Sequence, residues 1–136
     1  MTLSDPTFSN YTKDQAKTYA EHRPSYAKPL YDVIIGHHVQ TGGQLNVVAD
    51  VGCGPGNATR DLALSFDYAI GVDPGVEMIN TARQLGGYTA AHQKISYAVS
   101  GAETFDASIR ETLPVVEENG GVDLVTAAMA VFHPCI

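Results

Sequence analysis

The segment Val47-Val-Ala-Asp-Val-Gly-Cys-Gly-Pro-Gly-Asn57 constrains the fold of this chain more than any other. An apolar run reaches an acidic residue, Asp50, and passes into a turn with glycines at three alternate positions. Gly52 can adopt backbone conformations that are costly for other residues, and Gly54 and Gly56 lack the Cβ that would hold a ligand away from the main chain. A helix that starts after this turn would offer free N–H groups at the same place. The pattern predicts a strand, a tight loop and a helix, with a ligand site at the carboxyl end of a parallel strand.

The spacing of the glycines narrows the class of ligand. A dinucleotide fingerprint closes with Gly or Ala at the sixth position, where this chain has Asn57, and the third glycine comes one residue early. A nicotinamide-dependent oxidoreductase is therefore the weaker hypothesis. A second acidic residue, Asp73, ends the apolar run 68–73, about twenty residues beyond the loop, which is where an acid meets ribose hydroxyls.

Short apolar runs alternate with helical patterns along most of the chain. We expect strands at 45–50, 68–73, 95–99 and 122–127, with helices near 58–65, 76–84 and 103–113. Near-continuous apolar strands between helices are typical of a parallel sheet that is buried on both faces. The fold class is therefore α/β, a Rossmann-like parallel sheet flanked by helices.

The N-terminal part has a different pattern. Helices are expected at 12–21 and 25–39; in the second, Pro29 would be tolerated only in the first turn. One face of it would carry Leu30, Val33, Ile34 and one of the adjacent histidines, His37 or His38. A length of 136 residues supports one domain, with a helical segment at 1–44 and an α/β core at 45–136.

Charge and hydropathy argue against several kinds of partner. The net charge is −7, and the eight Lys and Arg residues form no run, so nucleic acid is not expected. No apolar stretch approaches the roughly 18 residues of a membrane span. The polar N-terminus lacks a signal-peptide pattern, which leads us to expect a cytoplasmic location. These properties suit a small-molecule substrate.

The cysteines and histidines do not indicate a metal or nucleophilic centre. Cys53 and Cys135 are too few for a disulfide framework. Cys53 is expected to be a small buried side chain in the glycine loop. His37, His38, His92 and His133 lack zinc-site spacing, so no metal site is expected.

Five segments together resemble the class I S-adenosylmethionine-dependent methyltransferases, of the methyltransferase-11 type. The resemblance is strongest to the trans-aconitate methyltransferase-like group with its many fungal members. It is carried by Tyr19-Ala-Glu-His-Arg-Pro-Ser-Tyr26, Asp50-Val-Gly-Cys-Gly-Pro-Gly56, Gly71-Val-Asp-Pro-Gly-Val-Glu-Met78, Ser100-Gly-Ala-Glu-Thr-Phe105 and Val122-Asp-Leu-Val-Thr-Ala-Ala-Met-Ala130. The resemblance implies strand order 3-2-1-4, S-adenosyl-L-methionine as cofactor, S-adenosyl-L-homocysteine as product, and methyl transfer to a small molecule.

The resemblance also implies roles for residues of the first two strand ends. Gly52, Gly54 and Gly56 would pass beneath the methionine part and the sugar of the cofactor. Asp50 would lie near the cofactor's amino group and order the turn. Asp73 would accept hydrogen bonds from both ribose hydroxyls; its alternative role is to cap the helix that begins near position 76.

The resemblance implies further cofactor contacts from residues later in the chain and from the N-terminal segment. Met78 would cover the adenine face, although it could equally be a core residue. Ala102 and Glu103 would approach the adenine edge, unless Glu103 is only a first-turn acid favoured by the helix dipole. Tyr19 and Arg23 would close over the cofactor, with Arg23 pairing its carboxylate. Alternatively, Tyr19 and Tyr26 could be half-buried packing residues, and Arg23 could form an ion pair with a surface acid.

The resemblance stops short of a complete fold, which has seven strands in order 3-2-1-4-5-7-6. This chain ends soon after the fourth, with Phe132-His133-Pro134 where the family continues, which suggests a truncated product. No catalytic residue is assigned; His133 is the sole candidate base near the fourth strand. The apolar run 124–129 would be an unprotected edge that invites pairing with another chain. A homodimer, or a catalytically inactive interaction subunit that completes its sheet with a partner, is therefore an alternative.

Overall fold

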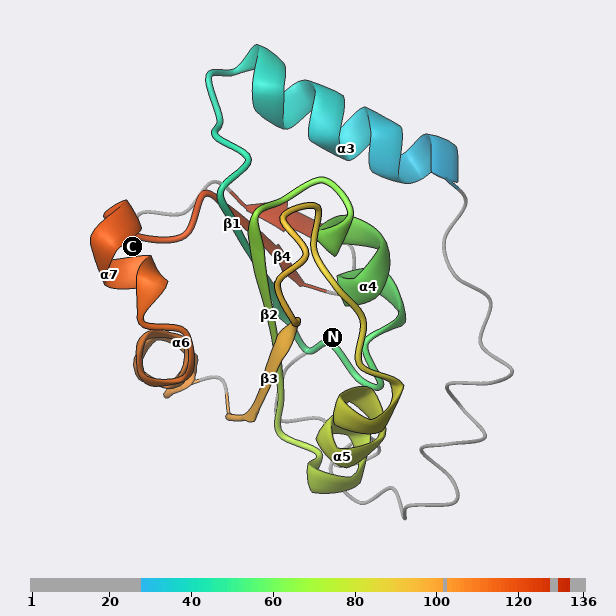
Figure 1. The fold of residues 1–136 in the computed structure, drawn as a ribbon, viewed down its shortest axis with the longest axis vertical. Coiled ribbons are helices and arrows are strands. Elements are labelled where there is room, and N and C mark those ends of the chain that lie inside the picture. The colour runs from blue at the N-terminus through green and yellow to red at the C-terminus, as the bar shows by residue number, and fades with distance from the viewer. Residues whose placement is uncertain (1–27, 102, 128–129, 133–136) are drawn as a thin grey trace.

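A five-stranded sheet forms the centre of the chain, with helices on both of its faces (Figure 1). The computed structural model describes residues 28–101, 103–127 and 130–132. The strand order is β3-β2-β1-β4-β5. The first four strands in the chain are parallel: β1 (Val47–Val51), β2 (Tyr68–Asp73), β3 (Ser96–Val99) and β4 (Leu124–Ala127). The predicted α/β class and the parallel order 3-2-1-4 are confirmed.

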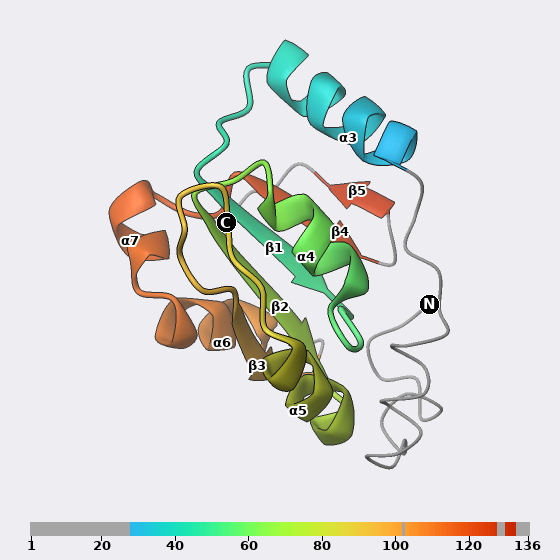
Figure 2. The same ribbon diagram turned by 45° about the vertical axis from the view of Figure 1, so that its right-hand side comes forward.

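The sheet is apolar on both faces because helices cover both. On one face, α3 (Lys28–Gln40), α4 (Asn57–Ala63) and α5 (Val76–Leu85) pack over it; their buried side chains share one core with Val48, Ala69 and Tyr97. On the other, α6 (Phe105–Thr112) and α7 (Val115–Asn119) share a second core with Val47, Ala49, Val72 and other strand residues. The turned view in Figure 2 separates these two layers. All five residues of β1 are buried, as expected for a central strand.

One helix of the second layer was not expected. The predicted helix 103–113 is α6, which begins at Phe105, and a separate short helix, α7, follows it. Pro114 precedes the first turn of α7, Glu117 and Glu118 lie within that turn, and Gly120 ends it in the left-handed region at φ 80°. Proline at a helix start and glycine at its end are the usual boundary signals, but the helix is too short to show a periodic apolar pattern.

Helix α3 (Lys28–Gln40) overlaps most of the predicted helix 25–39, and the predicted face is buried only in part. Tyr31, Ile34 and His38 are buried, whereas Leu30 and Val33 are exposed, Val33 at 68%. Both sets have helical spacing, so periodicity alone cannot choose between them. Tertiary packing chooses, because the His38 ring lies against Phe66, with centroids 6.1 Å apart, and its Nε2 lies 2.6 Å from the Gln44 carbonyl oxygen. The helix expected at 12–21 lies outside the described residues.

The fourth strand is not the open edge that the sequence suggested. The short strand β5 (Ala130–Phe132) pairs with it antiparallel, in register with Val125, Thr126 and Ala127. The chain turns back on itself, so its own peptide groups occupy the hydrogen-bonding positions that a bare edge would offer. His133 and Cys135 lie outside the described residues. No helix in the described ranges is both long and apolar enough to span a membrane.

Candidate functional site

The predicted strand, loop and helix meet at the carboxyl end of β1. All three loop glycines have positive φ: Gly52 at 72°, Gly54 at 56° and Gly56 at 88°, conformations that favour glycine. The N–H groups of Gly52 and Cys53 both donate to the Val72 carbonyl oxygen, at 2.7 and 3.0 Å. The loop is therefore hydrogen-bonded to the end of the neighbouring strand β2, which holds its backbone in one shape.

Asp73 ties this loop to the next turn. One carboxylate oxygen accepts the Gly54 N–H at 3.0 Å, and the other accepts the Gly75 N–H at 2.8 Å. Gly75, not Asp73, is the residue that precedes α5 at the cap position, so Asp73 is not simply a helix cap. Burial raises the pKa of the Asp73 carboxyl above its ordinary value, and the two N–H donors oppose that rise. Asp73 is thus a buried acceptor shared by two turns.

Asp50 ties three elements together in a different way. Its Oδ2 accepts the Thr59 hydroxyl of α4 at 2.7 Å, and its Oδ1 accepts the Thr126 hydroxyl of β4 at 2.9 Å. The side chain is buried in the centre of the sheet end. Two hydroxyl donors offset part of the penalty for burying a carboxylate. The carboxylate joins the strand before the loop to the helix after it and to the adjacent strand.

Arg60 and Tyr97 shape the loop and were missed from the sequence, as was Thr126. A Cβ placed on Gly56 would lie 2.9 Å from the Tyr97 hydroxyl oxygen and 2.9 Å from Arg60 Nη1, so these side chains would have to shift, and the φ of 88° disfavours other residues there. Arg60 donates to the Pro55 carbonyl oxygen at 2.9 Å, which braces the loop from α4. Thr126 offered a signal, because a hydroxyl inside an apolar strand needs a buried partner. Tyr97 offered none, since aromatic residues are common in strands.

Cys53 behaves as the sequence suggested. It is a free, buried thiol within the core of the α4–α5 face. Its Sγ donates to the Gly54 carbonyl oxygen at 3.3 Å. Burial raises the pKa of this thiol well above its ordinary value, and the nearby charges of Asp50 and Asp73 raise it further. The thiolate is therefore disfavoured, which confirms a packing role and argues against a nucleophile.

The remaining predicted cofactor contacts lie on α5, just before α6 or outside the described residues. Met78 is fully buried on α5. Glu103 is exposed and precedes Thr104, the cap residue of α6, so the first-turn acid is Asp106 and not Glu103. Tyr19, Arg23 and Ala102 lie outside the described residues. The contacts of all these residues with a cofactor stay predictions.

Comparison with known proteins identifies the family of this chain. A family model described as "Methyltransferase domain" matches residues 48–135. Methyltransferase cfoB of Aspergillus candidus is 35% identical over 82 residues, 60% of this chain and 26% of that protein. Trans-aconitate 2-methyltransferase of Streptomyces avermitilis is 32% identical over 89 residues, 64% of this chain and 33% of that protein. A crystal structure of an S-adenosylmethionine-dependent methyltransferase from Clostridium acetobutylicum aligns at 26% identity and TM-score 0.48, covering 62% of this chain and 35% of that one.

The chain therefore belongs to the methyltransferase domain family. The match begins inside β1 and includes the glycine loop, Asp73 and the later strands. The chain spans about a quarter to a third of the length of the two curated relatives named here. It corresponds to the part of the fold that holds the glycine loop.

Proposed function

We propose that this chain forms the S-adenosyl-L-methionine-binding half of an enzyme that transfers a methyl group to a small molecule. One observation carries the proposal: the three left-handed glycines lie at the carboxyl end of β1, and the Asp73 carboxylate holds both this loop and the turn before α5. Open α/β sheets bind their ligands at this kind of position. Membership of the methyltransferase domain family supports the choice of ligand.

The residues at this strand end suit the proposed cofactor. Each Asp73 oxygen accepts one N–H, and an ionised carboxylate has about four lone-pair positions. Acceptor capacity is therefore left for the two ribose hydroxyls. Gly52 and Gly54 present main chain without a Cβ beside Asp73, which suits close passage of the methionine part. We assign Asp73 to binding of the ribose hydroxyls. The loop glycines would pass beneath the methionine part and the sugar of the cofactor, and Asp50 would order the loop.

In methyl transfer, this half of the protein has only to bind and orient the cofactor. S-adenosyl-L-methionine supplies an activated methyl group on its sulfonium centre, and the protein's own residues bind and orient it. Rate enhancement then comes chiefly from alignment of the acceptor and exclusion of water. We assign no general base within the described residues. Met78, Glu103, Ala102, Tyr19 and Arg23 complete the proposed set of cofactor contacts.

A small organic acceptor and a cytoplasmic location belong to the same proposal. The name of one relative, trans-aconitate 2-methyltransferase, supports a small-molecule acceptor. Cys53, a free buried thiol, suits a reducing compartment. Fluorescence imaging of the tagged protein checks the location, and a membrane-enclosed or secreted signal would contradict it.

Calorimetric titration of the purified chain with S-adenosyl-L-methionine and S-adenosyl-L-homocysteine tests the cofactor site. We expect saturable binding of both, lost in Asp73→Ala and kept in Asp106→Ala, which removes an exposed acid on α6. A folded chain that binds neither ligand would contradict the proposal.

A thermal shift series separates this cofactor from a dinucleotide. A ligand that binds the folded state alone raises the melting temperature. We expect S-adenosyl-L-homocysteine to raise it and NAD to leave it unchanged. The reverse order would favour the oxidoreductase hypothesis.

A further inference from the structure

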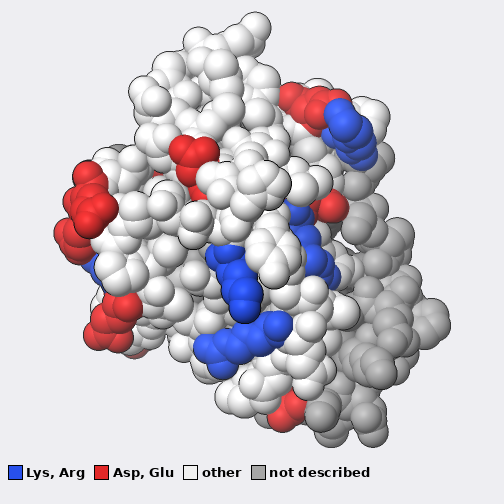
Figure 3. All heavy atoms as spheres, viewed as in Figure 1, with Lys and Arg blue, Asp and Glu red and all other residues white. Residues whose placement is uncertain are grey.

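Three basic side chains gather on the face covered by α4 and α5. Of the five Lys and Arg residues in the described ranges, Lys28 pairs with an acid on α3, and Arg110 pairs with acids on α6 and α7. Within those ranges, Arg60, Arg83 and Lys94 form no ion pair. Figure 3 shows basic side chains near the middle of this face, with most acidic ones toward its periphery. In a chain of net charge −7, this patch is a local reversal of sign.

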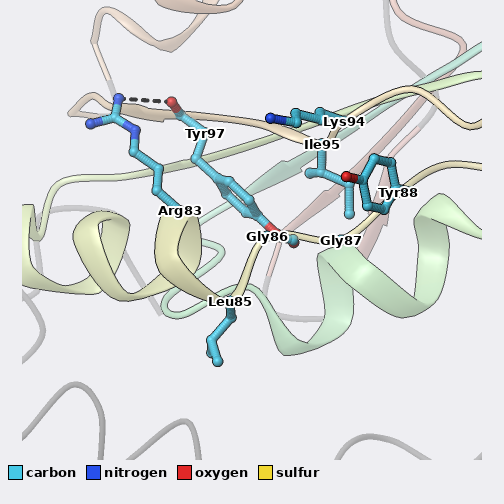
Figure 4. A pocket seen from close by; sticks show the side chains of 8 residues that line it. All are labelled: Arg83, Leu85, Gly86, Gly87, Tyr88, Lys94, Ile95 and Tyr97. Atoms are coloured by element: carbon cyan, nitrogen blue, oxygen red, sulfur yellow. Dashed lines mark hydrogen bonds between the residues drawn. The ribbon is translucent and has the colours of Figure 1, made fainter.

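Two of these cations border a pocket of about 320 Å³. The pocket lies between the end of α5 and the connection 86–95 that leads to β3. Its lining combines two cations with aromatic and aliphatic side chains: Arg83, Leu85, Gly86, Gly87, Tyr88, Lys94, Ile95 and Tyr97. Figure 4 shows the charged ends of Arg83 and Lys94 on one side of the pocket, while Leu85 points away from the other side chains. A volume of this size is at the lower end of ordinary small-molecule sites.

The frame of the pocket is held by backbone and buried hydrogen bonds. Tyr88 and Lys94 face each other as an isolated antiparallel bridge, and the Ile95 N–H donates to the Gly87 carbonyl oxygen at 3.1 Å. The Tyr97 hydroxyl donates to the Gly86 carbonyl oxygen at 3.1 Å. Burial raises the pKa of Tyr97 to about 12, so this donor stays protonated at neutral pH. A preorganised frame reduces the ordering cost of binding.

The cations at this pocket have unused donor capacity. Arg83 gives one hydrogen bond, from Nη2 to the Tyr97 carbonyl oxygen at 2.9 Å, and a guanidinium has five N–H donors. The exposed Lys94 makes no hydrogen bond or ion pair within the described residues. Arg60 has less donor capacity left, because its guanidinium group donates to the Pro55 carbonyl oxygen and to Asn57 Oδ1. Arg60 therefore adds positive charge beside the pocket, and the other two supply donors.

We propose that this pocket binds a small organic anion, a carboxylate or phosphate carried on a flat apolar body. Arg83 and Lys94 hold the anionic group, because a guanidinium fork and an ammonium both suit it. The Tyr88 and Ile95 side chains pack against the apolar body. The pocket lining includes no residue of the glycine loop; Tyr97, which lines the pocket, also has its hydroxyl near Gly56.

Titration of the ¹⁵N-labelled chain with phenyl phosphate and with benzoate tests the proposal, with phenol as the uncharged control. We expect saturable shifts at the amides of Gly86, Gly87, Tyr88, Lys94 and Ile95 with at least one anion, weaker at high salt because exposed charges are screened. The stronger of the two anions identifies phosphate or carboxylate as the preferred group. No shifts at these amides, or equal shifts with phenol, would overturn the proposal.

The double variant Arg83→Gln/Lys94→Gln provides a second test of the anion-binding proposal. Loss of two exposed charge contacts should weaken anion binding about tenfold, while binding of S-adenosyl-L-homocysteine is unchanged, which separates this site from the proposed cofactor site. Lys28→Gln, which removes an exposed cation on α3, is the matched control and should bind the anion as the parent does. A preserved amide spectrum confirms that the double variant is folded. Anion binding equal to that of the parent in this folded variant would overturn the assignment of the two cations.

Discussion

The ends of β1 and β2 lie side by side in the sheet, and each buries one carboxylate in a different kind of hydrogen-bond arrangement. Asp50 is 3% exposed and accepts two side-chain hydroxyls, from Thr59 and Thr126. Asp73 is 2% exposed and accepts two backbone N–H groups, from Gly54 and Gly75. Both carboxylates are buried to nearly the same degree, and these donors differ in kind.

The kind of donor decides what each carboxylate can hold in place. A hydroxyl rotates, and it can donate or accept, so the Thr59 and Thr126 side chains can adjust to a changed partner. A backbone N–H can only donate, and its direction is set by the turn to which it belongs. The Asp50 end therefore joins elements through adaptable side chains, whereas the Asp73 end fixes the backbone shape of two turns. The rigid end is the one that we propose holds the cofactor's ribose.

The largest expected effect comes from truncation of each acid to alanine. Asp73→Ala leaves two buried N–H groups without an acceptor, at about 1–3 kcal/mol for each unsatisfied group. We expect the free energy of unfolding to fall by about 3 kcal/mol. Asp50→Ala should lower it by about 1–2 kcal/mol, because the two hydroxyls can turn to other acceptors. Urea denaturation followed by circular dichroism measures both, and an equal or reversed order would remove the distinction between the two ends.

Replacement by asparagine sharpens the same comparison. Asp73→Asn turns an NH₂ group toward one backbone N–H, and two donors then face each other. We expect a loss of about 2 kcal/mol there. Asp50→Asn presents its NH₂ to a hydroxyl oxygen that can accept it, so the loss should stay below about 1 kcal/mol. The same denaturation experiment applies, and similar losses at both positions would contradict the assigned roles of the donors.

The threonine partners of Asp50 give a smaller effect. Thr126→Val and Thr59→Val each remove one hydroxyl donor with little change of shape, and each should lower the free energy of unfolding by about 1 kcal/mol. Neither residue contacts the loop glycines through a hydrogen bond in the described chain, so binding of S-adenosyl-L-homocysteine should persist. Calorimetry on both variants checks this, and loss of binding in either would assign the hydroxyls a direct part in the cofactor site.

The smallest effect is a pH dependence at Asp73. Burial raises its pKa in the folded state above the ordinary value of 3.8. The folded state therefore holds this proton to higher pH than the unfolded state does, and the associated stability is lost as pH rises through the folded-state pKa. The stability difference between the parent and Asp73→Asn should accordingly shrink as pH rises above 3.8. A series of urea titrations between pH 3.5 and pH 7 would measure it, roughly the interval over which a carboxyl with a raised pKa ionises; a growing difference would contradict the direction.

Much of the fold could be predicted because its signals are local. The glycine spacing after β1, the apolar runs and the acid at the end of β2 each depend on a few consecutive residues. They predicted a parallel sheet, the loop and the position of Asp73 in this chain, whereas the strand order 3-2-1-4 was implied by the family resemblance. The buried face of α3 was predicted only in part: Ile34 and His38 are buried as expected, but residues 30 and 33 repeat with the same spacing as the buried residues 31 and 34. Packing of His38 against Phe66 makes the choice.

Sequence spacing thus determined which backbone segments become strands, helices and the glycine loop, since helical and strand periods and glycine's conformational freedom act over short distances. Only the tertiary structure decided which groups meet. Thr126 reaches Asp50 across 76 positions, and β5 folds back onto β4. Arg83 and Lys94 converge on one pocket because the connection 86–95 folds over the end of α5. Such partnerships depend on packing between distant segments, and no local pattern records them.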